Sequence, residues 1–183
     1  TVNNGGMISG FGNISGAVTV NNGGKFKPGN SPGYMHLMSS LTFNSNSIFQ
    51  QDIAGTAQAN ASTPTGATGY YSFTQVDGVA TINSGSTLKP MLRNLFTSDE
   101  SGYGSAPYVP KLGDQFRILT ATGGITGRFS TLTQPDGLAS GTQFVSFYNM
   151  NNSNSLDLAI VPSSYKTTIS SASGNKNAQS VGS

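Results

Sequence analysis

The sequence predicts an all-β protein folded as a single-stranded parallel β-helix, a β-solenoid in which short strands stack coil upon coil. Three observations support this prediction. Gly, Ser, Thr and Asn make up 86 of the 183 residues, and only 16 side chains are charged. Short alternating runs of β-branched and aromatic residues are separated by Asn-Gly and Ser-Gly pairs, which are typical of turns. Similar phrases recur along the chain at an almost constant offset, which suits one coil of a solenoid.

The composition excludes several other classes of protein. Ala, Leu, Glu, Lys and Arg are too scarce for a helical bundle, and the apolar runs are far shorter than the roughly 20 residues of a membrane span. Without cysteine there is no disulfide scaffold. Ten Phe and seven Tyr in short β-prone runs argue against disorder. The basic residues are scattered and the net charge is only +2, so we expect no nucleic-acid partner.

The repeat is visible from the first residue. Residues 1–6 (TVNNGG) recur as residues 19–24, an offset of 18, and residues 41–44 follow residues 18–21 by 23. The phrase at 80–85 has an offset of 39 from the phrase that starts at residue 41, which we interpret as about two periods. Each unit is then a short strand, an Asn-Gly or Ser-Gly turn and a second short strand, such as 24–27 or 86–89.

In a solenoid, each of these residue types has a characteristic position. Thr and Ser face outward in ladders, whereas Asn and Gly occupy corners, where both tolerate positive φ and where successive amides can hydrogen-bond along the stack. In the solenoid, apolar residues form inward columns, which would include Val18, Val20, Leu41, Phe43, Ile82 and Leu88.

The rival interpretation is an antiparallel sandwich with Asn-Gly hairpins.

The repeat becomes less regular toward the C-terminus. Two segments rich in small polar residues predict loop insertions, near 55–69 and near 97–107. We predict a β-helix over residues 1–165 and a flexible linker over 166–183. The remaining strand candidates are 71–76, 79–82, 115–120, 143–148 and 156–161.

Several motifs match a known family. Residues 16–33 (GAVTVNNGGKFKPGNSPG) resemble the passenger-associated transport repeat of bacterial autotransporters, and residues 77–90 look like its next block. Residues 108–129 are similar to the end of many passengers, just before the outer-membrane barrel, and residues 156–162 match the closing strand. Residues 177–181 look like the start of the segment that threads the barrel.

The resemblance implies a right-handed β-helix of a type V secretion system, exported through the periplasm and displayed at the bacterial surface. It implies two partners, an outer-membrane β-barrel and an N-terminal passenger. We therefore interpret the chain as a fragment of a longer protein, because residue 1 opens in mid-pattern. The implied role is non-catalytic: the stable, first-folding part of the passenger, often called the autochaperone region.

Large apolar residues late in the chain fit a folding core and C-terminal cap. We expect Phe116→Ala or Phe147→Ala to reduce passenger display much more than Phe26→Ala. The residues predicted for this core and cap are Phe116, Ile118, Phe129, Phe144, Phe147, Leu156 and Leu158.

The sequence gives little support for catalysis or metal binding, and we predict no catalytic residue, cofactor or metal site. His36 is the only histidine, in a slot that the family usually fills with a small or aliphatic residue, and it has no nucleophile signature beside it. Asp99 and Glu100 share a loop that could hold calcium weakly, although a solvated loop is the simpler interpretation. The run at 123–127 lacks the Lys-Ser/Thr of a phosphate loop.

Two alternatives to the folding role remain open. One is a polysaccharide-active β-helix enzyme, which would need two or three carboxylates on one face, and the sequence shows no such pair one coil apart. The other is an adhesin surface that contacts glycans or a second copy of itself. Tyr70, Tyr71 and Tyr103 flank the insertions and are the candidates for this contact, although capping of the hydrophobic column explains them as well.

Overall fold

The computed structural model describes residues 1–30, 32–64, 67–93, 108–150 and 153–164. These residues form seventeen β-strands, and within them no helix is long and apolar enough to cross a membrane. The all-β prediction is confirmed. The second predicted insertion, at 97–107, and the predicted linker at 166–183 lie outside the described residues.

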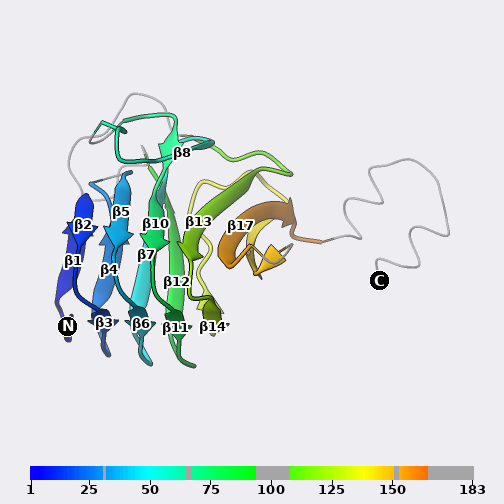
Figure 1. Ribbon diagram of the computed structural model, residues 1–183. Coiled ribbons are helices and arrows are strands. Elements are labelled where there is room, and N and C mark those ends of the chain that lie inside the picture. The colour runs from blue at the N-terminus through cyan, green and yellow to red at the C-terminus, as the bar shows by residue number, and fades with distance from the viewer. Residues whose placement is uncertain (31, 65–66, 94–107, 151–152, 165–183) are drawn as a thin grey trace, which may run out of the picture.

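The strands form three sheets that run side by side along the molecule (Figure 1). The first sheet contains β1 (Met7–Gly10), β4 (Lys25–Pro28), β7 (Ile48–Ile53), β12 (Thr87–Leu92) and β15 (Thr131–Leu132) in spatial order. The second contains β2 (Gly12–Ile14), β5 (Tyr34–Leu37), β10 (Phe73–Val76), β13 (Gln115–Ala121), β17 (Ser155–Pro162) and β16 (Thr142–Tyr148). The third contains β3 (Val18–Val20), β6 (Leu41–Phe43), β11 (Ala80–Ile82) and β14 (Ile125–Gly127).

From β1 to β15 the chain visits the three sheets in a fixed cyclic order, and each circuit pairs in parallel with the one before it. Met7 pairs with Lys25, Lys25 with Ile48, Ile48 with Thr87 and Thr87 with Thr131. The offsets of successive circuits are therefore 18, 23, 39 and 44. The predicted offsets of 18 and 23 are confirmed, and these parallel registers contradict the antiparallel sandwich for this part of the chain.

The offset of 39 belongs to a single circuit, so our interpretation of it as two periods is wrong. The extra length is an insertion between β7 and β10 that contains β8 (Ala57–Gln58) and β9 (Tyr70–Tyr71). Short strand pairings hold this insertion in place: β8 pairs with β9, and Ile53 of β7 pairs with Tyr71. In its described residues, 55–64 and 67–69, the predicted insertion is a flap with paired strands and a buried Ala59, and not a wholly exposed loop.

The core consists of inward side chains stacked in columns. All six residues that the repeat predicted to face inward are buried. Four Phe rings form the centre: Phe43 lies 5.1 Å from Phe49 and 5.2 Å from Phe129, and Phe26 lies 5.7 Å from Phe49. Burial of each such side chain stabilises the fold by about 1.5–3 kcal/mol.

Side-chain ladders follow the same register on the outside. The amide of Asn21 donates to Asn3 at 2.9 Å, Asn44 to Asn21 at 2.7 Å and Asn83 to Asn44 at 2.8 Å. These bonds confirm the predicted stacking of corner amides. On the third sheet, one threonine from each strand forms an outward column, in the order Thr19, Thr42, Thr81 and Thr126.

Candidate functional site

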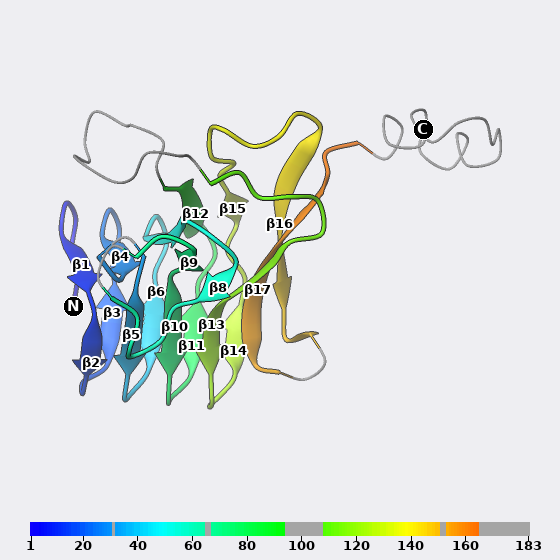
Figure 2. The ribbon, with the colours of Figure 1, turned by 90° about the horizontal axis from the view of Figure 1, so that it is seen from above.

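The two ends of the stack differ, and this asymmetry is the most distinctive feature of the fold (Figure 2). At the C-terminal end, β17 pairs antiparallel with β13 and β16 pairs antiparallel with β17. At the N-terminal end, β1, β2 and β3 are the outermost strands of their sheets. Met7 and Phe11 are strongly exposed at this end.

The C-terminal hairpin β16–β17 closes the core with apolar side chains. Phe144, Leu156, Leu158 and Ile160 are almost wholly buried. The Phe116 ring packs 6.0 Å from Phe144, which joins the hairpin to the last parallel strand of the second sheet. Predicted strand 143–148 corresponds to β16 and predicted strand 156–161 to β17, so both strand predictions are confirmed.

Most of the predicted folding-core residues are inside the protein, but Phe147 is not. Phe116, Ile118, Phe144, Leu156 and Leu158 are buried, and Phe129 is partly buried against Phe43 and Phe49. Phe147 is 38% exposed, so its placement in the core is wrong. Side chains alternate along a strand, and the register of β16 turns Phe144 inward and Phe147 outward.

The predicted tyrosine contacts are only partly at the surface. Tyr71 is buried, packs edge-on 5.3 Å from the Phe116 ring, and its hydroxyl accepts a hydrogen bond from the Arg117 amide. Burial raises the pKa of the Tyr71 hydroxyl. Tyr71 therefore supports the core, as the capping interpretation holds, and is not a surface contact. Tyr70 is partly exposed, and Tyr103 lies outside the described residues.

Among the described residues, the most buried charged side chain is Asp52, on β7. Its carboxylate accepts a hydrogen bond from Arg93 at 2.8 Å, lies 3.7 Å from the Lys27 ammonium group and is contacted by the Gln50 amide. Asp52 is fully buried, and the cations are nearly so. Sequence reasoning missed this group, because its members are far apart in the chain and only the sheet register brings them together.

The only histidine also pairs with a carboxylate. His36 Nε2 lies 2.8 Å from Asp77 Oδ1, between neighbouring strands of the second sheet. The hydrogen bond with His36 lowers the pKa of the Asp77 carboxyl, against a smaller opposing effect of burial. His36 is thus an outward strand residue with a carboxylate partner.

The two carboxylates near the cap have their own partners. Asp114 accepts hydrogen bonds from the Tyr108 hydroxyl at 3.0 Å and the Lys111 amide at 2.8 Å. Burial and the bond to Asp114 together raise the pKa of Tyr108. Asp157 accepts from Arg117 at 3.0 Å and from the Ser155 hydroxyl at 2.6 Å.

No three metal-ligating side chains converge among the described residues, and Asp99 and Glu100 lie outside them.

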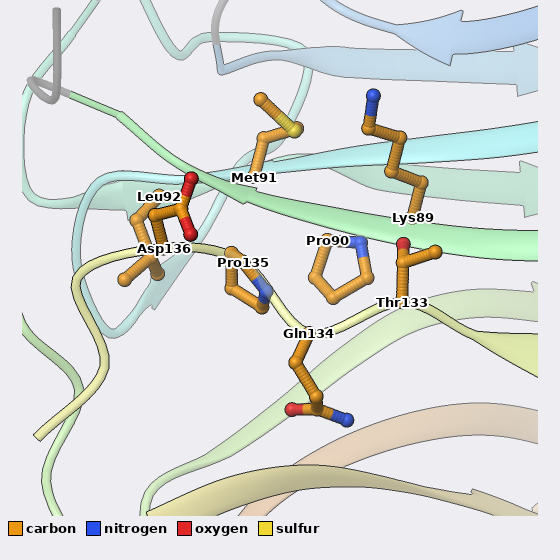
Figure 3. A pocket seen from close by; sticks show the side chains of 8 residues that line it. All are labelled: Lys89, Pro90, Met91, Leu92, Thr133, Gln134, Pro135 and Asp136. Carbon is orange, nitrogen blue, oxygen red and sulfur yellow. The ribbon is translucent and has the colours of Figure 1, made fainter. Parts of the chain in front are cut away.

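A cavity of about 260 Å³ lies where β15 separates from β12 (Figure 3). It is lined by Lys89, Pro90, Met91, Leu92, Thr133, Gln134, Pro135 and Asp136. Thr87 donates its backbone amide to Ser47, just before β7, and Arg93 donates to Ile53 at the end of β7. The Leu88 carbonyl instead accepts from Thr133 on the β15 side. Because the backbone groups of a strand alternate in direction, Pro90 points to this open edge, where its missing N–H discourages an added strand.

No protein-family model matches this chain, and a search of curated proteins finds no significant relative. Function is therefore inferred from the molecule itself: a stack with a closed C-terminal end and an open N-terminal end, in which Asp52, Asp77, Asp114 and Asp157 each have separate partners.

Proposed function

We propose that this chain is a right-handed parallel β-helix that forms the C-terminal part of an autotransporter passenger and acts as its folding nucleus. The observation that carries the proposal is the difference between the two ends of the stack. One end is covered by the antiparallel hairpin β16–β17, and the other presents three strand edges. A solenoid of this kind adds coils in only one direction.

The closed end supports the role of a nucleus. Strands β16 and β17 form a hairpin that is local in sequence, and β13 pairs with it to complete an antiparallel unit that buries its own apolar face. Contacts that are local in sequence form at a low entropic cost of loop closure, so this hairpin can form early. Strand β13 joins it across 35–44 residues, and the apolar area that the three strands bury stabilises the unit. The Tyr71 ring on Phe116 then connects it to the preceding circuit.

The open end supports the role of a template. The edges of β1, β2 and β3 offer backbone groups to a further parallel strand. Asn3 begins the amide ladder, and Val2 already forms a parallel bridge to Val20, which extends the third sheet by a residue. An upstream coil with the same Asn-Gly corners would continue both the ladder and the core column, as nearest-neighbour stacking requires.

This proposal places the protein at the bacterial surface, after export through the periplasm and an outer-membrane barrel. The export route rests on the resemblance of residues 16–33 and 108–129 to autotransporter passengers. The lack of cysteine suits passage through an oxidising compartment. The proposed role needs no catalytic group.

A display experiment tests the proposal. The chain is placed between a reporter domain and an outer-membrane β-barrel, and protease accessibility of the reporter on intact cells is measured relative to the amount of barrel. Leu158→Asp in the cap and Val18→Asp near the open end both put a carboxylate into the core. We expect about a tenfold loss of display for Leu158→Asp and less than about a twofold loss for Val18→Asp. Equal losses would contradict a C-terminal nucleus.

A further inference from the structure

Phe11 is the most exposed large apolar residue of the described chain, and the backbone is built to present it. It is 71% exposed and lies between β1 and β2. Gly10 and Gly12 on either side have φ values of 111° and 109°, a region that other residues rarely adopt. Gly10 is also held by reciprocal backbone hydrogen bonds with Gly29, so the position of the Phe11 turn is fixed.

The Phe11 turn forms one wall of a small cavity on the outer side of the second sheet. The cavity measures about 80 Å³, and the opposite wall is the flap between β7 and β10. Both views place this flap over the strands of the second sheet (Figures 1 and 2). The lining residues are Phe11, Gly12, Asn13, Tyr34, Asn60, Ala61 and Thr63.

Both walls and the floor are held in place. The Asn60 backbone N–H donates to the Thr63 hydroxyl at 2.8 Å, and the Asn60 side-chain oxygen accepts from the Ser62 backbone N–H at 2.9 Å. These bonds fix the rim of the flap. Tyr34 stacks 5.9 Å from Phe73 and donates its hydroxyl to Gln75 at 2.9 Å. The Tyr34 ring and the backbone of the Phe11 turn are therefore already positioned, and a ligand would lose little affinity to ordering them.

The lining has a specific chemistry. It contains two aromatic rings, the amide groups of Asn13 and Asn60 and the hydroxyl groups of Tyr34 and Thr63, and no charged side chain. Among the described residues, the Asn13 side chain makes no hydrogen bond to the protein. Aromatic faces pack on the C–H faces of pyranose rings, and amides hydrogen-bond their hydroxyl groups in both directions. The absence of charge disfavours phosphate, acidic sugars and charged peptides.

We propose that the Phe11 groove, formed by Phe11, Asn13, Tyr34, Asn60 and Thr63, binds a neutral oligosaccharide. Phe11 stacks on one sugar ring, and Asn13 and Asn60 bind its hydroxyl groups. Next to Asn13 the outward row of the second sheet continues through His36 and Gln75, so further sugar units would lie on polar side chains. The groove differs from the tyrosine contact predicted from sequence, and it lies in the terminal circuit on which the proposed function stacks an upstream coil.

Direct binding tests this proposal. The chain contains no Trp, so Phe11→Trp introduces a single indole at the groove and supplies a fluorescence signal. Titration with cellohexaose, chitohexaose and mannohexaose is expected to shift the emission of this variant at millimolar or lower concentration. Saturation-transfer NMR on the unmodified chain is expected to show contact with the same sugar.

Matched variants locate the site. Phe11→Ala is expected to weaken binding at least about fivefold and Asn13→Ala at least about twofold, while the unfolding midpoint stays unchanged because both side chains are at the surface. Met7→Ala, an exposed apolar residue on the neighbouring strand β1 and outside the groove, is expected to leave binding unchanged. If none of the three sugars binds at millimolar concentration, or if Phe11→Ala binds as well as Met7→Ala, the proposal is wrong. Neither outcome would bear on the folding role.

Discussion

The side chain of Gln134 donates one hydrogen bond to the backbone of Phe144 and accepts another from it, as a neighbouring strand would. The Phe144 amide donates to the Gln134 Oε1 at 2.7 Å, and the Gln134 Nε2 donates to the Phe144 carbonyl at 3.0 Å. Phe144 belongs to β16, the outermost strand of the second sheet. One side chain thus satisfies backbone groups at the edge of the cap and leaves them unavailable to another strand.

Gln134→Ala is expected to destabilise the protein by about 1–3 kcal/mol, because it leaves two partly buried backbone groups without this partner. The measurement is urea unfolding followed by circular dichroism. Gln143→Ala provides the control, since this glutamine lies next to Phe144 on β16 and makes no side-chain hydrogen bond among the described residues. Equal midpoints for the two variants would contradict the role of Gln134.

The buried carboxylate of Asp52 predicts a larger effect. Asp52→Asn keeps the shape of the side chain but removes the charge that faces Arg93 and Lys27. Breaking a buried ion pair from one side typically costs about 3–5 kcal/mol, and we expect a loss in this range from chemical unfolding. Asp136→Asn, in an exposed loop, is expected to change stability by less than about 0.5 kcal/mol. A loss below about 1 kcal/mol for Asp52→Asn would show that the ion group is unimportant.

The His36–Asp77 pair predicts a dependence of stability on pH in the acid range. The pKa of Asp77 is lowered from its ordinary value of 3.8 in the native state. Its contribution to stability is therefore complete above pH 3.8 and is lost as the pH falls through the lowered native pKa. We expect Asp77→Asn to flatten this part of the curve of unfolding free energy against pH. Superimposable acid limbs for Asp77→Asn and the unmodified chain would contradict the prediction.

The exposure of Phe147 reverses part of the ranking expected from sequence. Phe26 and Phe116 are fully buried, so replacing either by Ala is expected to cost about 3–5 kcal/mol. Phe147→Ala is expected to cost less than about 1 kcal/mol, because the side chain faces outward. Thermal and urea unfolding of the three variants check this order. A loss for Phe147→Ala as large as that for Phe116→Ala would mean that the outward face of β16 is covered in solution.

The parts of the fold that the sequence predicted are those in which the repeat is undisturbed. The offsets of 18 and 23 set the register of Asn3 on Asn21, of Val18 on Leu41 and of Asn21 on Asn44. The longer circuit from β7 to β12 was misread, because the pairing of β8 with β9 inside the insertion leaves no periodic signal. The sequence also shows apolar residues on both faces of β16, so only the pairing with β17 decides that Phe144 and not Phe147 faces the core.

The candidate sites depended on contacts that sequence spacing does not reveal. Lys27, Asp52 and Arg93 meet through register alone. The Phe11 groove needs the flap between β7 and β10 to lie over the second sheet, which no local pattern predicts. The sequence does contain one indication of the groove: Phe11 lies between two glycines in an otherwise polar turn.

Folding of the C-terminal cap before the rest of the chain, the central claim, is tested most directly by pulse-labelling hydrogen exchange during refolding, with the labelled peptides resolved by mass spectrometry. We predict that peptides covering β13, β16 and β17 become protected first and that those covering β1, β2 and β3 become protected last. Protection that arises at the same time throughout the chain, or first at the N-terminal end, would contradict this claim.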